Sequence, residues 1–472
     1  MSIKLTVFLG LILNSEQYQD PHFGSISKQL LHRIEVQPFN AIAFLIFALA
    51  ITHTFFARKI AVTSDNLKKK YKNDNPTPLQ LFFIEFLYFM GEVEVILGIW
   101  VIPLLMAMTY FFDWDTTIAY LNSVSYIEPL FVVTVMAVAG SLPILRFAEK
   151  CLHIVAKIGK STIESFWWSI LFLGPLLGSF ITEPAAMSIC ALLLAKEFYK
   201  FHPSKKFAYA TLGLLFTNIS VGGVLTNYAA PPVLMVVKPW GYSSSYMFST
   251  FGIKAIAGIF LANLLYWLIF RAEFAKMEET RKNAASNEPK EKPIPLWITI
   301  VHLAFLAWIV LHLHEPVIFI GSLLLYLGFY KATTEFQAEL DLKTPVLVGF
   351  FLVGLVIHGH LQEWWISPLL QDISKDLLMV ISLVLTAFND NAQITFLATL
   401  IPNFNATMKY AVIVGAVAGG GLTIIANAPN LVGQSFLKPY FKDGISALWL
   451  FLGAILPTIC MLIAFYFNQP AP

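Results

Sequence analysis

Charged residues are scarce in this 472-residue chain. Asp, Glu, Lys and Arg make up 13% of it and apolar residues 57%, whereas soluble domains carry roughly 25% charged residues. No polar stretch is long enough to form a soluble domain, and a net charge of +2 gives no indication of nucleic-acid binding. The composition therefore predicts an all-α polytopic membrane protein.

Cysteine is nearly absent, and the three cysteines lack the spacing of a metal site. Cys151, Cys190 and Cys460 lie in or beside apolar runs, where a small core side chain is the usual role. We expect them to be neither disulfide partners nor metal ligands, and we expect no cofactor.

Apolar runs of spanning length recur along the chain. A membrane-crossing helix needs roughly 20 residues, and the predicted spans lie at residues 39–56, 81–112, 127–145, 247–270, 295–313, 316–329, 345–361 and 447–467. Residues 3–13 form a shorter apolar run behind Lys4, which fits either a weak secretory signal or an interfacial helix. Residues 1–38 are therefore set apart as an N-terminal segment.

Two kinds of interrupted segment occur once in each half. An acidic break holds Glu183 in the first half and Asp390 in the second, and glycine breaks follow at residues 222–232 and 419–430. The arms around each acid are too short for a full crossing, so we expect re-entrant hairpins at residues 166–199 and 376–400. The alternative is a polar loop between spans. Paired interruptions in corresponding positions favour the substrate site of a secondary transporter.

The placement of Lys and Arg predicts the orientation of the chain. By the positive-inside rule the basic residues between 58 and 72 form a cytoplasmic loop, and the loop 113–125, which has no Lys or Arg, then falls outside. Basic residues also flank the first hairpin on both sides, so it enters and leaves from the cytoplasm. Each half has an odd number of crossings. We therefore expect two inverted repeats, whose acidic tips meet near the midplane.

One polar stretch divides these repeats. RAEFAKMEETRKNAASNEPKEK is linker-like and rich in charge. The predicted division is a first inverted repeat at residues 39–270, a cytoplasmic linker at 271–294 and a second inverted repeat at 295–472, each repeat with a re-entrant hairpin and a broken transmembrane helix.

The acidic tips carry the main candidates for ion binding. Glu183 stands between Thr182 and a proline, as at a helix start, and Asp390 stands between Asn389 and Asn391. The structural alternative is that both acids only complement a helix dipole. A charge at the bilayer centre costs at least about 2.5–3.5 kcal/mol, which favours a functional role. Desolvation favours the protonated carboxyl and a bound cation favours the carboxylate, so either group could exchange one for the other.

The glycine breaks offer further oxygen ligands. Backbone carbonyls exposed at such breaks, with amide and hydroxyl oxygens beside them, form the all-oxygen setting that hard alkali cations prefer. The alternative is that the glycines permit close helix packing. The predicted ligands are Thr226, Asn227, Thr423, Asn427 and Asn430, and the predicted backbone breaks are Gly222, Gly223, Gly420 and Gly421.

Three acids fall within the apolar run 81–112. Glu85, Glu92 and Glu94 would be costly in lipid. We expect Glu92 or Glu94 to face a polar interior, as a possible proton relay. An interfacial helix end, or a structural ion pair with Lys254, is the alternative.

Histidines gather at the predicted outer ends of spans. His312 and His314 precede Glu315, and His358 and His360 form a second pair. A metal site there would indicate a membrane metalloenzyme, but the HExxH motif is absent. Interfacial histidines are expected instead, one of which could sense pH. We expect no enzyme activity and no metal beyond transported Na⁺.

The glycine breaks resemble those of a known group of transporters. GGGLTIIANAPNLVG at 419–433 and GGVLTNYAAPPVLMV at 222–236 look like the paired unwound segments of the ion transporter superfamily, which includes NhaD-type sodium/proton antiporters, ArsB-like arsenite carriers and divalent-anion/sodium symporters. LTAFNDNAQITFLATLIP is similar to the NhaD-type hairpin motif, although Ala392-Gln393 depart from it. Over residues 126–468 the chain most resembles a bacterial family of sodium/proton antiporters.

That resemblance implies an inverted-repeat antiporter of the bacterial inner membrane, often a homodimer, which exchanges Na⁺ (or Li⁺) for H⁺ by alternating access. The dicarboxylate branch resembles a pattern with neutral hairpin tips, whereas the carboxylates here would repel an anion. Cation exchange is therefore predicted, and an anion carrier for arsenite or carboxylates is the alternative. The resemblance carries ion ligation onto Thr182, Glu183, Asn227, Asp390, Asn391, Thr423 and Asn427.

Overall fold

The computed structural model describes residues 18, 20–21, 25–71, 76–283, 293–370, 373–402, 404–442 and 444–467. Within these ranges the chain is helical and contains no strand. Seven described helices are long and apolar enough to cross a membrane, or eight if the pair Trp114–Ser123 and Ile127–Ala139, bent by 57°, is counted as one span. The prediction of an all-α polytopic membrane protein is confirmed.

The described residues fall into two compact units. The first takes those of Met1–Leu130, Lys343–Asp372 and Leu400–Pro402, and the second takes those of Phe131–Leu342, Ile373–Thr399 and Asn403–Pro472. Both interrupted segments of each half thus belong to the second unit. The division into repeats at residues 39–270 and 295–472 stays a prediction.

The first unit packs around α3 (Phe39–Lys70), α5 (Val93–Phe111) and α18 (Lys343–Gly359). Close approach of α5 and α18 depends on glycine, because a Cβ on Gly98 would lie 2.2 Å from the Phe350 ring. The other described helices of this unit are α2 (Ile26–Val36), α4 (Pro78–Met90), α6 (Trp114–Ser123), η7 (His360–Gln362) and α19 (Glu363–Leu370), and α7 (Ile127–Ala139) crosses its boundary.

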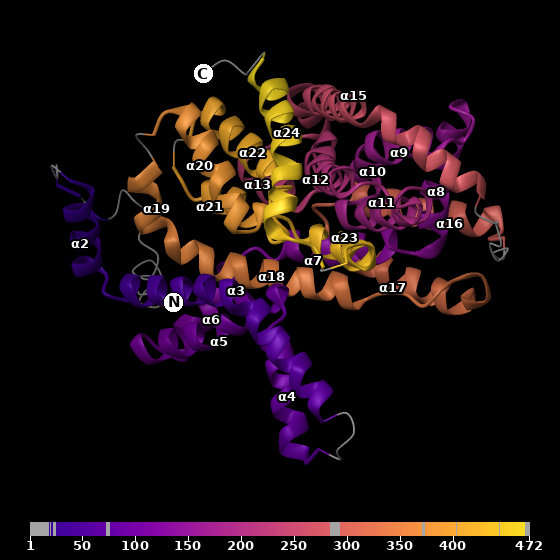
Figure 1. Ribbon diagram of the computed structural model, residues 1–472. Helices are drawn as coiled ribbons and strands as arrows, with labels where there is room; N and C mark the ends of the chain where they lie inside the picture. The colour runs from indigo at the N-terminus through magenta and orange to yellow at the C-terminus, as the bar shows by residue number, and fades with distance from the viewer. Residues whose placement is uncertain are drawn as a thin grey trace. The chain divides into compact units, whose positions relative to one another are not determined.

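Two expectations for this unit were wrong. The run 81–112 is not one span, since it breaks at Gly91 and Glu92 into α4 and α5. A Cβ on Gly91 would lie 2.7 Å from the backbone nitrogen of Ala61, so α4 packs tightly on α3. The basic residues from position 58 to Lys70 lie on the continuing helix α3 rather than in a loop. Figure 1 shows α4 running beside this part of α3, away from α6.

The second unit contains both hairpins. The first consists of α9 (Ile163–Trp168), a π-helical turn η2 (Ser169–Leu173), α10 (Gly174–Ile181) and α11 (Glu183–Glu197). Its arms are antiparallel, since Gly174 faces Cys190 and Gly178 faces Ala186. The second hairpin consists of α20 (Lys375–Phe388) and α21 (Asn391–Thr399). The first arm is longer than expected, because residues 163–181 reach the length of a span.

A broken helix follows each hairpin. The first runs through α12 (Lys205–Gly222), η4 (Gly223–Leu225), a non-helical stretch and α13 (Pro231–Trp240), and the second runs through α22 (Ala406–Gly419), a non-helical stretch and α23 (Pro429–Leu437). A long apolar helix ends each half, α15 (Ile253–Asn283) and α24 (Ala447–Tyr466). The order of elements in the two halves is therefore the same, as the sequence pattern predicted.

The remaining elements of the second unit connect and cover these parts. They are α8 (Leu142–Ile158), η3 (Tyr199–Phe201), α14 (Ser244–Met247), η5 (Phe248–Gly252), α16 (Leu296–Leu311), α17 (Pro316–Ala332), η6 (Thr334–Phe336) and η8 (Lys438–Tyr440). Because α15 continues to Asn283, the first part of the predicted linker 271–294 is helical. Residues 284–292 of it lie outside the described residues.

Candidate ion-binding site

The hairpins and broken helices pack against each other in a reciprocal way. The second arm of the first hairpin, α11, contacts α23 of the second broken helix, and the second arm of the second hairpin, α21, contacts α13 of the first (Figure 1). The first parts of the two broken helices, α12 and α22, also touch. This exchange brings the two acidic tips and the two breaks together in one place.

Matching hydrogen bonds show how the two halves align. The backbone N–H of Glu183 donates to the carbonyl of Ala229 at 3.3 Å, and the backbone N–H of Asn391 donates to the carbonyl of Ala426 at 3.1 Å. Glu183 is therefore equivalent to Asn391, and Asp390 is equivalent to Thr182. The two acids thus stand one residue out of register.

A second pair of matching bonds confirms this alignment. Thr226 donates its hydroxyl to the carbonyl of Ser179 at 2.7 Å, and Thr423 donates to the carbonyl of Ala387 at 2.8 Å. Both hydroxyls therefore tie the break to the first arm of its own hairpin. These two predicted ligands have a clear structural role in the described geometry.

Glycines at equivalent positions let the tips approach the breaks. A Cβ on Gly223 would lie 2.4 Å from Oε1 of Glu183, and a Cβ on Gly420 would lie 2.1 Å from Oγ of Ser220 and 3.1 Å from Nδ2 of Asn391. Each of these glycines faces the tip of its own half. A side chain at either position would displace the groups beside it.

The neighbouring glycines bring the helices themselves together. A Cβ on Gly222 would meet the carbonyl oxygen of Pro175 at 2.4 Å, and one on Gly421 would meet Oγ1 of Thr217 at 2.2 Å. Close packing, weighed above as the alternative role of the glycines, is therefore real. It occurs at the same breaks that carry the polar groups.

Glu183 is enclosed completely. Its side chain is 0% exposed, and its Oε2 accepts a hydrogen bond from Nδ2 of Asn427 at 3.1 Å. Oε1 has no hydrogen-bond partner among the described residues. A buried carboxylate with one free oxygen is costly, so this position has capacity for a proton or a cation.

Asp390 has a different environment. It is half-buried, and its carboxylate accepts the backbone N–H of Ala392 at 2.8 Å and that of Ala428 at 3.1 Å. It therefore caps the first turn of α21 and also holds the start of α23. Hydrogen bonds from two helix N-termini stabilise the charged form of this carboxylate.

One break holds both acids. Asn427 binds Glu183 through its side chain, and the next residue, Ala428, binds Asp390 through its backbone. The two carboxyl groups are close enough to interact electrostatically. They belong to a single polar site rather than to two separate ones.

Further buried oxygens surround this site. Besides Glu183, four of the predicted ligands have a buried side-chain oxygen with no hydrogen-bond partner in the described ranges: Thr182 Oγ1, Asn391 Oδ1, Asn427 Oδ1 and Asn430 Oδ1. Amide, hydroxyl and carboxylate oxygens are the ligands of hard cations. The chemistry of this donor set therefore fits an alkali cation such as Na⁺.

Thr182 has an unusual backbone conformation. Its φ is 76° and its ψ is 151°, a region that is costly for a β-branched residue. The side chain is buried and lines a small cavity beside α7, together with Tyr228. Strain of this kind concentrates at functional sites, and here it lies directly before Glu183.

Three other predicted residues have defined partners. Asn227 donates to the carbonyl of Tyr242 at 3.2 Å and accepts from the hydroxyl of Ser244 at 2.7 Å, so its amide holds the start of α14. Asn430 donates to the carbonyl of Gly420 at 2.7 Å. Asn389 follows the last residue of α20, and its backbone N–H donates to the carbonyl of Thr386 at 3.1 Å.

The sequence did not single out two serines of the site. Ser220 donates to the carbonyl of Val417 at 2.8 Å and accepts from Nδ2 of Asn391 at 3.3 Å, which joins the two halves. Ser179 donates to the carbonyl of Gly222 at 2.6 Å. The only sequence feature that could have identified them is a hydroxyl within an otherwise apolar stretch.

Glu92 and Glu94 lie in the first unit, at the start of α5. Nζ of Lys343 lies 3.4 Å from the Glu92 carboxylate, so this acid has an ion-pair partner within its own unit. Lys254, proposed above as the partner, donates to the hydroxyl of Tyr410 at 3.0 Å. A proton relay through Glu92 or Glu94 stays a prediction.

The histidine pairs do not form a metal cluster in the described part of the chain. No group of three or more His, Cys, Asp or Glu there could hold a metal ion. The ring of His312 packs against that of Trp308, with centroids 4.1 Å apart and planes tilted by 43°, and His358 is buried beside Phe47. Both histidines thus pack against aromatic rings.

Comparison with known proteins shows which family the chain matches. A model of the family described as "Putative Na+/H+ antiporter" matches residues 38–468. Among solved structures, the chain is similar to the YdaH transporter of Alcanivorax borkumensis, with 13% sequence identity, a TM-score of 0.41, and coverage of 76% of this chain and 87% of that one. No curated protein matches the chain.

Proposed function

The chain belongs to this Na⁺/H⁺ antiporter family, and from that premise we propose that it is a secondary active transporter that exchanges Na⁺ (or Li⁺) for H⁺ by alternating access. The observation that carries the proposal is the pair of carboxylates held by consecutive residues, Asn427 and Ala428. A broader kinship with NhaD-type antiporters and ArsB-like carriers, a homodimeric state and a location in the bacterial inner membrane are part of the same proposal.

Glu183 is the group on which the two ions compete. Enclosed from water, this side chain is stable either as a neutral acid or as a carboxylate with a cation against it. Oε1 is available to both. Binding Na⁺ therefore requires release of the proton, and binding the proton requires release of Na⁺, which is the coupling that antiport needs.

Asp390 supplies fixed negative charge beside this exchange. Its two backbone hydrogen bonds favour the anion, so it attracts the cation without itself being enclosed. The unpartnered oxygens of Thr182, Asn391 and Asn427 would complete the cation's shell. Reciprocal packing of hairpins against broken helices gives each half a part in the site.

Two alternatives have less support. An anion carrier for arsenite or carboxylates would place its substrate against Glu183 and Asp390, which repel it. A membrane metalloenzyme would need a cluster of ligands, and the described residues contain none.

The test uses the purified full chain in proteoliposomes with an internal pH dye. An imposed Na⁺ gradient should build a pH gradient with wild type, and Glu183→Gln and Asp390→Asn should abolish it. Asn405→Asp, a change at the exposed cap of α22, serves as a control that retains transport. If gradients of Na⁺, Li⁺ and K⁺ cause no pH change with wild type over a broad pH range, cation antiport is refuted.

A further inference from the structure

A cavity separate from the ion site lies against the first arm of the first hairpin. It has a volume of about 480 Å³ and is bounded by the end of α8, by α9 and by the π-helical turn η2. Small-molecule sites commonly measure roughly 300–1,000 Å³. None of the residues that line it belongs to the ion site described above.

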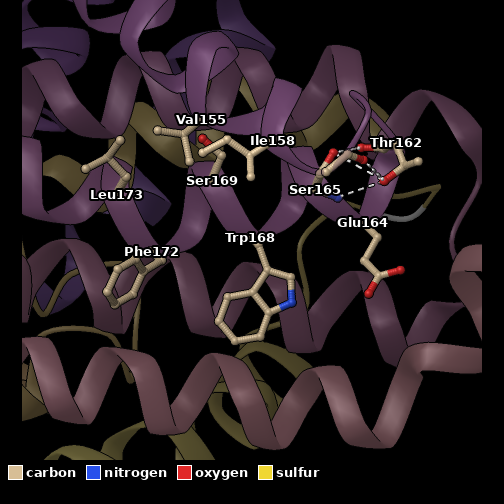
Figure 2. A pocket seen from close by; sticks show the side chains of 10 residues that line it. Val155, Ile158, Thr162, Glu164, Ser165, Trp168, Ser169, Phe172 and Leu173 are labelled. Atoms are coloured by element: carbon tan, nitrogen blue, oxygen red, sulfur yellow. Dashed lines mark hydrogen bonds between the residues drawn. The ribbon is translucent and has the colours of Figure 1, made fainter.

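The cavity has chemically distinct ends (Figure 2). Thr162, Glu164 and Ser165 lie at one end, Phe172 and Leu173 lie at the other, and the indole of Trp168 stands between them. Ile158 on its rim is 85% exposed, so the cavity is open on that side. An elongated ligand with a polar head and an apolar chain fits this arrangement.

The polar end is built around a carboxylate. Oε1 of Glu164 accepts a hydrogen bond from the indole N–H of Trp267 on α15, which fixes the orientation of the side chain. Trp168 packs on Phe260 of the same helix, with ring centroids 5.8 Å apart. An acid and an aromatic face held side by side are the groups that bind an organic ammonium ion.

Two lysines are sequence neighbours of residues that line the cavity. Lys157 and Lys160 are exposed and flank Ile158 and Gly159, which line the cavity. The positive-inside rule predicts that this end of the hairpin faces the cytoplasm, so it lies at the level of lipid headgroups. A headgroup at this level would meet the carboxylate of Glu164 in the cavity and has two exposed lysines beside Ile158 and Gly159.

We propose that this cavity binds a phospholipid with a primary ammonium headgroup, phosphatidylethanolamine. Its ammonium donates to Glu164 and lies against Trp168, its phosphate faces Lys157 and Lys160, and an acyl chain follows Phe172 and Leu173. A choline headgroup has no N–H to donate, and the glycerol headgroup of an anionic lipid has no cation for Glu164. The site therefore distinguishes lipids by headgroup, and this inference does not depend on the proposed transport activity.

The experiment measures quenching of tryptophan fluorescence by lipids with brominated chains, using delipidated full-length protein in detergent. The signal of Trp168 is the part lost in Trp168→Phe, and Trp308→Phe, which removes another exposed tryptophan, serves as the control. We expect saturable quenching of Trp168 by phosphatidylethanolamine, with phosphatidylcholine and phosphatidylglycerol at least about tenfold weaker, as for loss of a hydrogen bond to a charged group.

Variants then separate recognition from structure. Glu164→Gln should remove the preference for phosphatidylethanolamine. Glu273→Gln, which removes a carboxylate of α15 that binds Ser204 and does not line the cavity, should retain that preference and so controls for damage to the fold. Equal quenching by all three lipids in wild type, or an unchanged preference in Glu164→Gln, would overturn the proposal.

Discussion

The side-chain amide of Asn427 donates a hydrogen bond of 3.1 Å to the fully enclosed carboxylate of Glu183. The two residues are far apart in the sequence and come from opposite halves of the chain. The bond therefore links the tip of the first hairpin to the break of the second broken helix. Any movement that separates the hairpin from that break must also change the environment of the acid.

Replacing Asn427 by Ala should weaken Na⁺ binding. Without the amide donor, the charged form of Glu183 loses a hydrogen bond worth about 1.5–3 kcal/mol, so protons compete better. We expect the apparent KM for Na⁺ to rise at least about tenfold, and the activity profile to move to higher pH. Asn405→Ala, a helix cap elsewhere, should lower stability slightly and leave this KM unchanged. An unaltered KM in Asn427→Ala would show that the bond has no part in ion binding.

Gly223→Ala should abolish or strongly reduce transport. Its Cβ would lie 2.4 Å from Oε1 of Glu183, which displaces the oxygen that we assign to ion binding, at a cost of about 1–3 kcal/mol in stability. Gly321→Ala on α17 is the matched control, since nothing lies within 4 Å of its Cβ. Na⁺-driven pH change in proteoliposomes and thermal unfolding check both variants. Wild-type transport in Gly223→Ala would contradict the assigned role of Oε1.

Substitutions of Thr182 can distinguish its backbone strain from the binding of a cation by its hydroxyl. Glycine readily adopts positive φ, so Thr182→Gly should relieve about 1–3 kcal/mol of backbone strain and melt no lower than wild type. It should nevertheless bind Na⁺ more weakly, because the hydroxyl is lost. Thr182→Ser keeps the hydroxyl and should keep the affinity. Wild-type Na⁺ affinity in Thr182→Gly would remove this hydroxyl from the set of ligands.

The alignment of the two halves predicts that the acid of the second tip cannot be moved by one residue. Asn391 is equivalent to Glu183, but its amide donates to Ser220, and only Asp390 reaches the N–H of Ala428. The double variant Asp390→Asn with Asn391→Asp should therefore be as inactive as Asp390→Asn alone in the proteoliposome assay. Restored transport would mean that the second tip provides charge without a defined position.

Outside the membrane-spanning helices, Glu149 on α8 predicts a dependence of stability on pH. His153, with Nε2 at 3.7 Å from its carboxylate, and the ion pair with Arg146 at 2.7 Å hold the pKa of Glu149 below its ordinary value. This contribution is present above the unfolded-state pKa and is lost as pH falls through the folded-state pKa. Glu149→Gln should therefore lower the free energy of unfolding near neutral pH by about 1 kcal/mol or less, and match wild type in acid, as followed by thermal unfolding at both pH values. A difference of equal size at both pH values would contradict this.

Much of the fold follows from patterns within short stretches of sequence. The interrupted segments, their repetition and the position of Glu183 at a helix start were predictable because Gly, Pro and acids inside apolar sequence have few other roles. The alignment of the two hairpin tips with each other could not be predicted. Both tips contain an acid, so Glu183 and Asp390 look equivalent, whereas backbone bonds to Ala229 and Ala426 set them one residue apart.

Partners that are distant in the sequence could not be predicted either. The ion pair of Glu92 depends on Lys343, far along the chain, and no local pattern distinguishes that lysine from Lys254. Ser179 and Ser220 could not be singled out from the sequence, because the carbonyls that they bind become available only where the broken helices end. The run 81–112 was apolar enough for one span, and its break follows from tight packing of Gly91 on α3.

The carboxylate of Asp390 binds two helices at once, since one oxygen caps α21 and the other accepts a hydrogen bond at the start of α23. Protonation of this carboxylate would remove negative charge from both helix ends, and both hydrogen bonds would weaken together. A cation bound beside the carboxylate would leave both hydrogen bonds intact. With Asp390 charged, as proposed above, the second hairpin and the second broken helix are therefore expected to move as one body.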